Sequence, residues 1–330
     1  MHRGCELLGS PLAILGGAMT WISERTLVAA ISNGGGFGVL ASGSMPPEAL
    51  REEIRQTRAL TDRPFGVNLI TLHPNLAQLI QVCADERVTH IVLAGGIPTA
   101  PMVRQAKESG AKVLCFTLST ALGRRLIRLG ADALILEGTE AGGHIGPVST
   151  SVLAQEILPE IRDVPVFIAG GIGRGEAMAL YLRMGAAGVQ LGTRFVCATE
   201  CIAHPAFKHA FLRAAAREAL PSVQVDTRFP VVPVRALQNE GTRRFQDKQR
   251  EVIARFDRGE ITKDAAQLDI EHFWAGALRR AVIEGDVENG SLMAGQSVGM
   301  VTREQPAASV LADLVAQAEA ALASDGVDVA

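Results

Sequence analysis

The residue with the clearest chemical potential is His144, which stands in a glycine-rich loop after a short apolar run. Residues 133–136 predict a buried strand, and the stretch from Glu137 to Gly146 surrounds one imidazole with glycines and carboxylates. An imidazole pKa of about 6.5 allows proton transfer close to neutral pH. Barrel enzymes often build their sites on such loops. We therefore expect His144 to be an acid or base, the alternative being a loop imidazole that only caps backbone groups.

Two later stretches predict a site for an anion. In VFIAGGIGRG, residues 166–175, a strand runs into Gly170 and Gly171, and the helix expected next offers free N–H groups. The following strand, residues 188–191, ends at Gly192 and Thr193. In a (βα)₈ barrel the loops after strands seven and eight form a common phosphate site. We favour phosphate binding over the alternative that these glycines only make tight turns.

The elements that must position these residues recur regularly along the chain. Strands that are apolar on both faces belong to parallel sheets covered by helices. The apolar runs are residues 12–15, 37–40, 65–69, 90–93, 112–116, 133–136, 166–169 and 188–191. Helical segments between them cover residues 24–32, 47–58, 99–109, 120–129, 151–161 and 176–184. This alternation predicts an α/β fold, a (βα)₈ TIM barrel, with an open doubly wound sheet as the alternative.

After residue 191 we expect helices without intervening strands. They cover residues 205–219, 242–258, 263–284 and 307–323, and a Pro-rich stretch at 229–234 and a Gly-rich stretch at 285–299 link them. This pattern predicts a barrel over residues 1–200 and a mostly helical insertion over residues 201–306 above the barrel mouth. A C-terminal helix in residues 307–330 would pack back on the barrel.

Composition limits the classes of partner. The 330 residues are 48% hydrophobic and carry a net charge of −3, which favours a large core and small-molecule substrates over nucleic acid. No apolar run reaches the ~18 residues of a membrane span. Five cysteines at scattered spacings fit a cytoplasmic protein with free thiols. We expect no metal site, although Cys197 and Cys201 lie four residues apart.

Several motifs follow one another along nearly the whole chain. The first six are Gly17-Ala18-Met19, Ser32-Asn33-Gly34-Gly35, Pro64-Phe65-Gly66-Val67-Asn68, Glu140-Ala141-Gly142-Gly143-His144, Ala169-Gly170-Gly171-Ile172 and Val189-Gln190-Leu191-Gly192-Thr193-Arg194-Phe195. Together they resemble the FMN-dependent nitronate monooxygenase (2-nitropropane dioxygenase) superfamily. The later motifs are His204-Pro205, Gly285-Asp286-Val287 and Ser291-Leu292-Met293-Ala294-Gly295-Gln296. These later motifs resemble the branch that contains the flavin-dependent enoyl-acyl-carrier-protein reductases.

The resemblance implies an FMN site with named residues. Its phosphate would lie on Gly170, Gly171, Gly192 and Thr193, and Gln190 would lie near the flavin or its ribityl chain. The ring would contact Gly17, Ala18, Met19, Asn68 and Gly143, and would be covered by Met293, Ala294, Gly295 and Gln296. Glu137 would lie nearby, although we favour a structural role in which its carboxylate holds the loop through backbone N–H groups. One departure concerns Gly16, because the family usually has glutamine there.

The resemblance also implies the reaction. In the reductase reading, NADH or NADPH supplies electrons for reduction of an enoyl thioester, and His144 protonates Cα. The alternative is a nitronate monooxygenase in which His144 deprotonates or orients a nitroalkane or nitronate that reacts with oxygen. A second alternative is a phosphate-binding barrel without redox chemistry.

Macromolecular partners are expected only in part. An acyl carrier protein and a homodimer follow from the resemblance. The basic residues Arg243, Arg244, Lys248 and Arg250 could meet an acidic carrier protein or a CoA phosphate. A solvated helix face is the alternative that we favour for this cluster.

Overall fold

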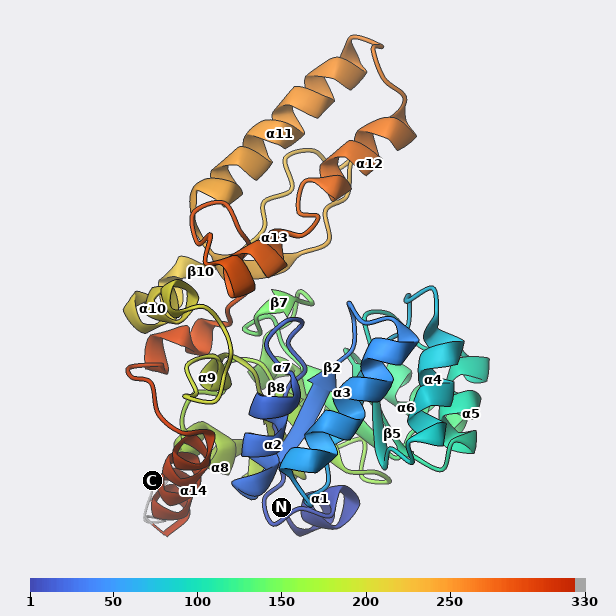
Figure 1. The fold of residues 1–330 in the computed structure, drawn as a ribbon, viewed down its shortest axis with the longest axis vertical. Coiled ribbons are helices and arrows are strands. Elements are labelled where there is room, and N and C mark those ends of the chain that lie inside the picture. Colours follow the sequence, from blue (N-terminus) through green and yellow to red (C-terminus); the bar gives the residue numbers. More distant parts are fainter. Residues whose placement is uncertain (324–330) are drawn as a thin grey trace.

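The protein is built around a closed barrel of eight parallel strands (Figure 1). The computed structural model describes residues 1–323. The barrel strands are β1 (Ile14–Gly16), β2 (Phe37–Ala41), β3 (Gly66–Ile70), β4 (His90–Ala94), β5 (Lys112–Thr117), β6 (Ala133–Glu137), β8 (Val166–Ala169) and β9 (Gly188–Leu191). β1 pairs with β9 and closes the barrel. The predicted TIM barrel is therefore confirmed, and the open doubly wound sheet is excluded.

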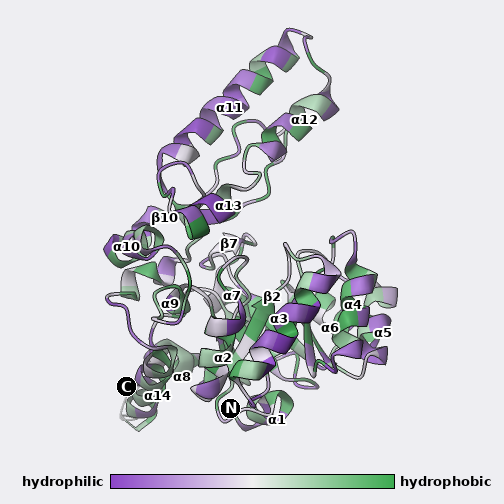
Figure 2. Ribbon diagram, viewed as in Figure 1, coloured by the Kyte–Doolittle hydropathy of each residue, from purple (hydrophilic) through white to green (hydrophobic). Residues whose placement is uncertain are grey.

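Side chains from each strand alternate between the barrel interior and the surrounding helices. Leu15, Ile135 and Phe167 pack together inside the barrel, whereas Leu134 and Leu136 join the larger core under the helices. The strand β2 accordingly has hydrophobic colours in Figure 2. The helix α1 (His2–Leu8) lies below the barrel in Figure 1, and its fully buried Leu8 belongs to the interior cluster. The end of the barrel opposite α1 is left for the site.

The wall helices have ends that the sequence marks. They are α2 (Arg25–Asn33), α3 (Pro47–Leu60), α4 (Leu76–Asp85), α5 (Ala100–Glu108), α6 (Thr120–Leu129), α7 (Thr150–Ile157) and α8 (Gly175–Arg183). The side chain of Ser119 caps the start of α6, and Gly130 ends it with a φ of 107° that suits glycine. The helix α14 (Ala307–Ala323) packs against α8 and α2. Residues 324–330 of the expected C-terminal segment lie outside the described residues.

Beyond the barrel, a helical arm stands apart from the strands in Figure 1. It consists of α11 (Glu240–Asp257) and α12 (Lys263–His272), and its separate core contains Phe245, Val252 and Ile270. Figure 2 shows α11 as mostly hydrophilic, in keeping with its exposed outer surface. Shorter elements connect the arm to the barrel: α9 (Thr193–Val196), α10 (Pro205–Arg213), α13 (Ala277–Arg279), η1 (Ala216–Glu218), η2 (Arg280–Glu284) and η3 (Gln296–Met300).

The expectation that no strands follow residue 191 is wrong. β10 (Ala219–Pro221) and β11 (Val234–Leu237) form a three-stranded antiparallel sheet with β7 (Gly143–His144). The expected helix at 205–219 consequently stops at Arg213. The expected helix at 263–284 is divided into α12, α13 and η2, with a break at Gly276, where φ is 70°. Short strands whose partners are distant in the chain leave no local periodic signal.

Within residues 1–323, no helix is both long enough and apolar enough to cross a bilayer. The division into three parts over residues 1–200, 201–306 and 307–330 remains our proposal for the domain organisation.

Candidate active site

The first and last barrel strands bring the first loop against the last one. A Cβ on Gly17 would lie 3.2 Å from the Gln190 side chain, and a Cβ on Gly192 would lie 3.3 Å from Met19 Sδ. The Gly17 N–H donates to the Leu191 carbonyl at 2.8 Å. Ala18 packs against the cluster that fills the barrel interior. Gly17, Ala18 and Met19, which the resemblance assigned to the flavin ring, thus gather at the barrel mouth with Gln190, which it assigned to the flavin or its ribityl chain.

Three polar side chains point into this mouth from strands that are not adjacent in the barrel. Asn68, Glu137 and Gln190 alternate with outward-facing residues of β3, β6 and β9. Asn68 Nδ2 donates to the Val92 carbonyl at 3.2 Å. Among residues 1–323 no group bonds to Asn68 Oδ1, to the Glu137 carboxyl or to the Gln190 amide. These free donors and acceptors fit the polar edge of a bound ring such as a flavin.

The carboxyl of Glu137 is enclosed by protein on most sides, although the residue still contacts solvent. Its surface is partly accessible, yet protein surrounds the carboxyl on most sides, as at the bottom of a cavity. Desolvation of this group raises its pKa to about 8. A carboxyl in this position is therefore largely protonated at neutral pH and can donate a hydrogen bond.

His144 lies on β7, which pairs with β11 opposite Val234. Its side chain is exposed, and no described residue hydrogen-bonds to the ring. The protein that surrounds the ring still lowers its pKa from the usual 6.5 by desolvation. An imidazole that faces open space without a protein partner is available to a substrate, which argues against a purely structural cap.

The loop that carries His144 is held by Glu140, which belongs to the motif around His144, and by Arg235, which the sequence did not single out. Glu140 Oε2 accepts hydrogen bonds from the Thr150 backbone N–H at 2.8 Å and from its hydroxyl at 2.9 Å. The guanidinium of Arg235 on β11 donates to the Thr139 carbonyl at 2.8 Å and to the Ala219 carbonyl at 2.5 Å. The structural role expected for Glu137 is therefore wrong, because Glu140 and Arg235 hold the loop instead.

The phosphate loops differ from expectation in one respect. Gly170 and Gly171 have φ of 93° and 74°, conformations that suit glycine and turn the chain sharply after β8. The start of α8 is covered by α14, since the Gly175 N–H donates to Gln317 Oε1 at 2.9 Å. Free N–H groups at this helix start were expected to attract an anion; the Gly175 N–H is bonded to protein, whereas Ala177 of the same helix start lines a cavity. Gly170, Gly171, Gly192 and Thr193 are left to hold a phosphate.

A cavity of about 370 Å³ adjoins this region. Gly170, Gly171, Gln296 and Arg217 belong to its lining, together with Glu140. His144, Asn68 and Gln190 do not line it. This cavity therefore lies beside the glycines expected to bind phosphate and not beside His144.

The stretch from Met293 to Gln296 packs directly on the loop of His144. A Cβ on Gly142 would lie 2.6 Å from the Gly295 nitrogen, and a Cβ on Gly143 would lie 3.6 Å from Met293 Sδ. The Gly295 N–H donates to Thr193 Oγ1 at 3.0 Å. The same short segment, which includes Ala294, thus joins the loops that follow β6 and β9.

Packing explains why this chain has Gly16 where the family usually has glutamine. A Cβ at this position would lie 2.5 Å from Ile31 Cδ1 on α2. The residue therefore points toward the helix layer, away from the barrel interior, so its lack of a side chain removes no group from the interior.

The sequence offered two further candidates, the cysteine pair Cys197 and Cys201 as metal ligands and the basic residues of α11 as a docking patch. Burial raises the pKa of both Cys197 and Cys201, to about 12 for Cys197, and no cluster suited to a metal ion occurs in the described part of the chain. On α11, Arg243 and Arg244 pair with Glu240, and Arg250 pairs with Asp247. Lys248 pairs with Asp269 of α12 at 3.0 Å. This pairing favours the solvated helix face over a docking patch.

Comparison with known proteins identifies relatives over most of the chain. The sequence profile described as nitronate monooxygenase matches residues 5–80 and 75–317. A nitronate monooxygenase from Paraburkholderia phytofirmans is 28% identical over 93% of this chain and 92% of its own. A (3aS,4S,5R,7aS)-5-hydroxy-7a-methyl-1-oxo-octahydro-1H-indene-4-carboxyl-CoA dehydrogenase from Mycobacterium tuberculosis is 34% identical over 74% of this chain and 68% of its own.

A solved structure extends the likeness to the whole chain. FabK from Thermotoga maritima is 36% identical and superposes with a TM-score of 0.87, over 97% of each chain. The family profile and the names of the curated relatives make this chain an oxidoreductase, and the family implies a flavin cofactor. The chain belongs to the nitronate monooxygenase family.

Proposed function

We propose that this enzyme binds FMN and uses NADH or NADPH to reduce the carbon–carbon double bond of an enoyl thioester. The observation that carries the proposal is the unpartnered imidazole of His144, held at the barrel mouth by strand pairing with β11. The β7–β11 pairing ties the site to the region after residue 200, where the sequence resembles the reductase branch. The coenzyme A thioester named in the Mycobacterium tuberculosis relative supports a thioester substrate.

The residues at the mouth fit FMN in both shape and polarity. Gly17 lacks a side chain where a Cβ would crowd Gln190, and Gly171 lacks one where a Cβ would lie 3.0 Å from Glu140. Asn68 and Gln190 would bond the polar edge of the ring, and the backbone at Gly171 and Gly192, with Thr193, would hold the phosphate. When bound, FMN supplies hydride transfer between the nicotinamide and the substrate.

His144 would hold and deliver the proton that reduction of the double bond requires at Cα. The pairing of β7 with β11 and the packing of residues 293–296 on the loop fix the backbone at His144. The neutral carboxylic acid of Glu137 would remain a hydrogen-bond donor inside the mouth. Proton transfer by a positioned side chain contributes about 10²–10⁴-fold to the rate.

A second candidate function is nitronate monooxygenase. The lowered pKa of His144 favours it, because an imidazole that is neutral at pH 7 is ready to accept a proton from a nitroalkane. The similarity to the Paraburkholderia phytofirmans enzyme spans 93% of the chain. The non-redox alternative has no support, since the family and its named members are oxidoreductases.

Anaerobic stopped-flow spectroscopy separates the two redox candidates. We expect NADH or NADPH to bleach the flavin absorbance, and a crotonyl thioester to restore it. Bleaching by a nitronate, with no bleaching by either nicotinamide, would overturn the reductase proposal in favour of the second candidate. An acyl carrier protein as carrier of the substrate, a homodimer and a cytoplasmic location are further proposals from the family resemblance.

A further inference from the structure

Three large hydrophobic side chains stand exposed on neighbouring loops of the barrel mouth. Leu72 follows β3, Ile97 follows β4 and Leu118 follows β5. Their exposed fractions are 79%, 61% and 47%. We call these residues the apolar rim. Adjacent exposed hydrophobic residues at the edge of a site are typical of a surface that binds an apolar ligand.

Two members of the apolar rim lie on adjoining segments, and the third reaches the loop of His144. A Cβ on Gly96 would lie 3.5 Å from Leu72 Cγ, which places Leu72 beside the segment that carries Ile97. A Cβ on Gly146 would lie 3.4 Å from Leu118 Cδ2, and Gly146 is two residues beyond His144. Leu118 therefore lies against the loop that carries the imidazole of the proposed reaction.

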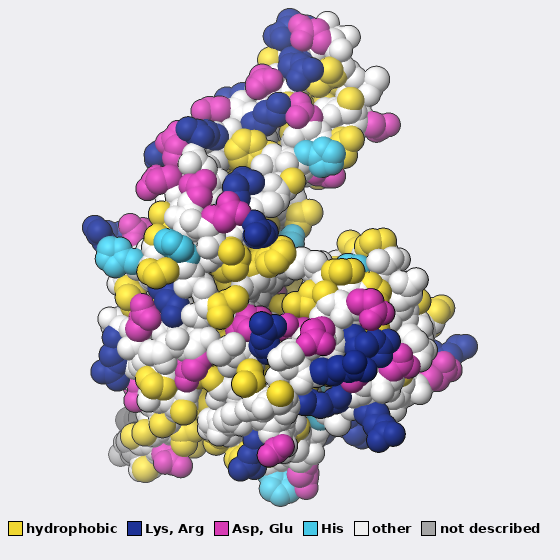
Figure 3. Space-filling model, in the orientation of Figure 1, with side chains coloured by type: hydrophobic (Ala, Val, Ile, Leu, Met, Phe, Trp, Pro, Cys, Tyr) yellow, Lys and Arg dark blue, Asp and Glu magenta, His cyan; other side chains and the backbone are white. Residues whose placement is uncertain are grey.

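The opposite side of this surface is also apolar. Val232 is 64% exposed, and the carbonyl of the adjacent Pro233 accepts a hydrogen bond from the Ile145 N–H at 3.0 Å. Val232 thus lies on the segment that flanks the His144 loop. Figure 3 shows hydrophobic side chains on both sides of the hollow between the barrel and the arm.

The loops of the apolar rim carry no charge. Residues 71–75, 95–99 and 117–119 contain no Lys, Arg, Asp or Glu. Neither a phosphate nor a carboxylate would find a charged partner there. The chemistry of the surface instead matches a hydrocarbon, which gains free energy by leaving water.

We infer that the apolar rim binds the hydrocarbon chain of the acyl thioester, so that the enzyme prefers medium or long uncharged chains to short ones. This inference rests on the proposed function, since it assigns the tail of the same substrate. The reacting carbons would lie near His144, and the chain would extend outward along Leu118 toward Ile97 and Leu72.

The test compares crotonyl, octenoyl and dodecenoyl thioesters with the holoenzyme. We expect kcat/KM to rise by about threefold per added methylene until the rim is covered. In the triple variant Leu72→Ser, Ile97→Ser, Leu118→Ser, the ratio of kcat/KM between dodecenoyl and crotonyl thioesters should fall at least about tenfold, mainly through KM. The double variant Leu60→Ser, Leu180→Ser removes leucines that are 49% and 54% exposed on α3 and α8, and should keep the wild-type ratio.

Binding of saturated acyl thioesters, measured by titration calorimetry, gives a readout that does not depend on turnover. Lauroyl thioester should bind wild type more tightly than butyryl thioester, and the triple variant should lose this difference while keeping its flavin spectrum. Equal binding of both thioesters by wild type would overturn the inference, even if enoyl thioesters are reduced. Chain-length-dependent binding without any reduction would contradict the proposed reaction and leave the rim assignment standing.

Discussion

At the scale of single residues, His144 offers the most direct test of the chemistry. His144→Gln keeps a polar side chain of similar length but cannot titrate, so we expect the flavin to stay bound and kcat to fall by about 10²–10⁴-fold. His209→Gln on the exposed face of α10 is the control, and it should behave like wild type. Wild-type turnover by His144→Gln would remove this histidine from the mechanism.

The pH profile of the wild-type enzyme reports the role of the same imidazole. Its pKa is lowered from 6.5 by desolvation, so the neutral form dominates at pH 7. If His144 donates a proton from the charged form, kcat/KM should fall as pH rises through this lowered pKa. If it accepts a proton, kcat/KM should instead fall as pH decreases through the same value. In either case, this fall of kcat/KM with pH should be absent in His144→Gln.

Glu137 gives a second prediction, which concerns stability. Its pKa is about 8 in the fold, above the ordinary 4.5, so the folded protein binds a proton more tightly than the unfolded chain. Stability should therefore decrease as pH rises between these two values, and Glu137→Gln should flatten that decrease. The gain in the variant at pH 8.5 should be on the order of 2 kcal/mol, allowing for solvent contact with the carboxyl.

Urea unfolding of the holoenzyme at pH 5.5 and pH 8.5 measures this effect. The exposed Glu156→Gln on α7 serves as the matched control and should keep the wild-type pH dependence. A Glu137→Gln protein with the same pH dependence as wild type would show that this carboxyl is ionised in the fold.

At the scale of elements, the contact between the His144 loop and residues 293–296 leaves no space for a side chain at Gly142. An alanine Cβ there would meet the backbone nitrogen of Gly295 at 2.6 Å and the Ala294 carbon at 2.7 Å. Because backbone atoms cannot rotate away, Gly142→Ala should displace the segment and weaken flavin binding at least about tenfold. Gly146→Ala meets only Leu118 at 3.4 Å, and should retain flavin through gel filtration. Equal flavin retention by both variants would contradict this account.

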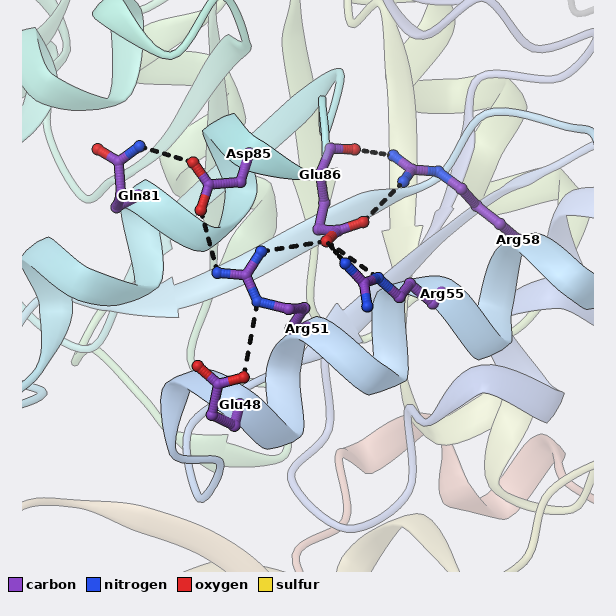
Figure 4. Close-up of polar contacts among 7 residues, drawn as sticks. All are labelled: Glu48, Arg51, Arg55, Arg58, Gln81, Asp85 and Glu86. Carbon is purple, nitrogen blue, oxygen red and sulfur yellow. Dashed lines mark hydrogen bonds and ion pairs between the residues drawn. The ribbon is translucent and has the colours of Figure 1, made fainter.

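The helices α3 and α4 are joined by a network of ion pairs around Glu86 (Figure 4). Its carboxylate accepts from Arg51 at 3.1 Å, from Arg55 at 2.8 Å and from Arg58 at 3.5 Å, although its side chain is only 10% exposed. Burial alone would raise its pKa, but the hydrogen bonds from Arg55 and Arg51 outweigh burial and lower it. The stability from this group is therefore present at neutral pH and lost as pH falls through its lowered pKa.

Glu86→Gln should lower the free energy of unfolding by about 1–2 kcal/mol, because it leaves three guanidinium groups close together. The control is Glu48→Gln, whose side chain is 87% exposed and lies 3.7 Å from Arg51. It should change stability by less than about 0.5 kcal/mol. Urea midpoints at low and high salt measure both variants, and equal effects would show that burial of Glu86 adds nothing.

The elements also show how far the sequence predicts this structure. The eight barrel strands were predicted because a strand buried on both faces is a continuous apolar run. β7, β10 and β11 were not, because strands of two to four residues depend on partners far along the chain. The motif around His144 indicated the site. That motif includes Glu140 but does not show its hydrogen bonds to Thr150. Arg235 gave no signal in the sequence, since its role arises from contacts with distant carbonyl groups.

At the scale of the whole molecule, elements that follow residue 200 meet the barrel at the site itself. The guanidinium of Arg279 on α13 lies 5.8 Å from the centre of the Trp21 ring in the first barrel loop. The buried Arg235 connects β11 to the sixth loop and to β10. These contacts imply that the region after residue 200 helps to position His144 and does more than cover the barrel.

Arg235→Met tests this connection while keeping most of the buried side-chain volume. Without the guanidinium, the Thr139 and Ala219 carbonyls lose a buried donor, at a cost of about 1–3 kcal/mol each, and β7 is free to shift with His144. We expect kcat to fall more than about tenfold with little change in KM, because the binding surfaces stay in place while the proton donor moves.

Arg228→Met is the matched control, since Arg228 is 45% exposed and pairs only with Asp226 and Asp257 among the described acidic residues. That variant should leave kcat unchanged. Equal kcat values for the two variants would mean that the Arg235 guanidinium does not help to position the imidazole.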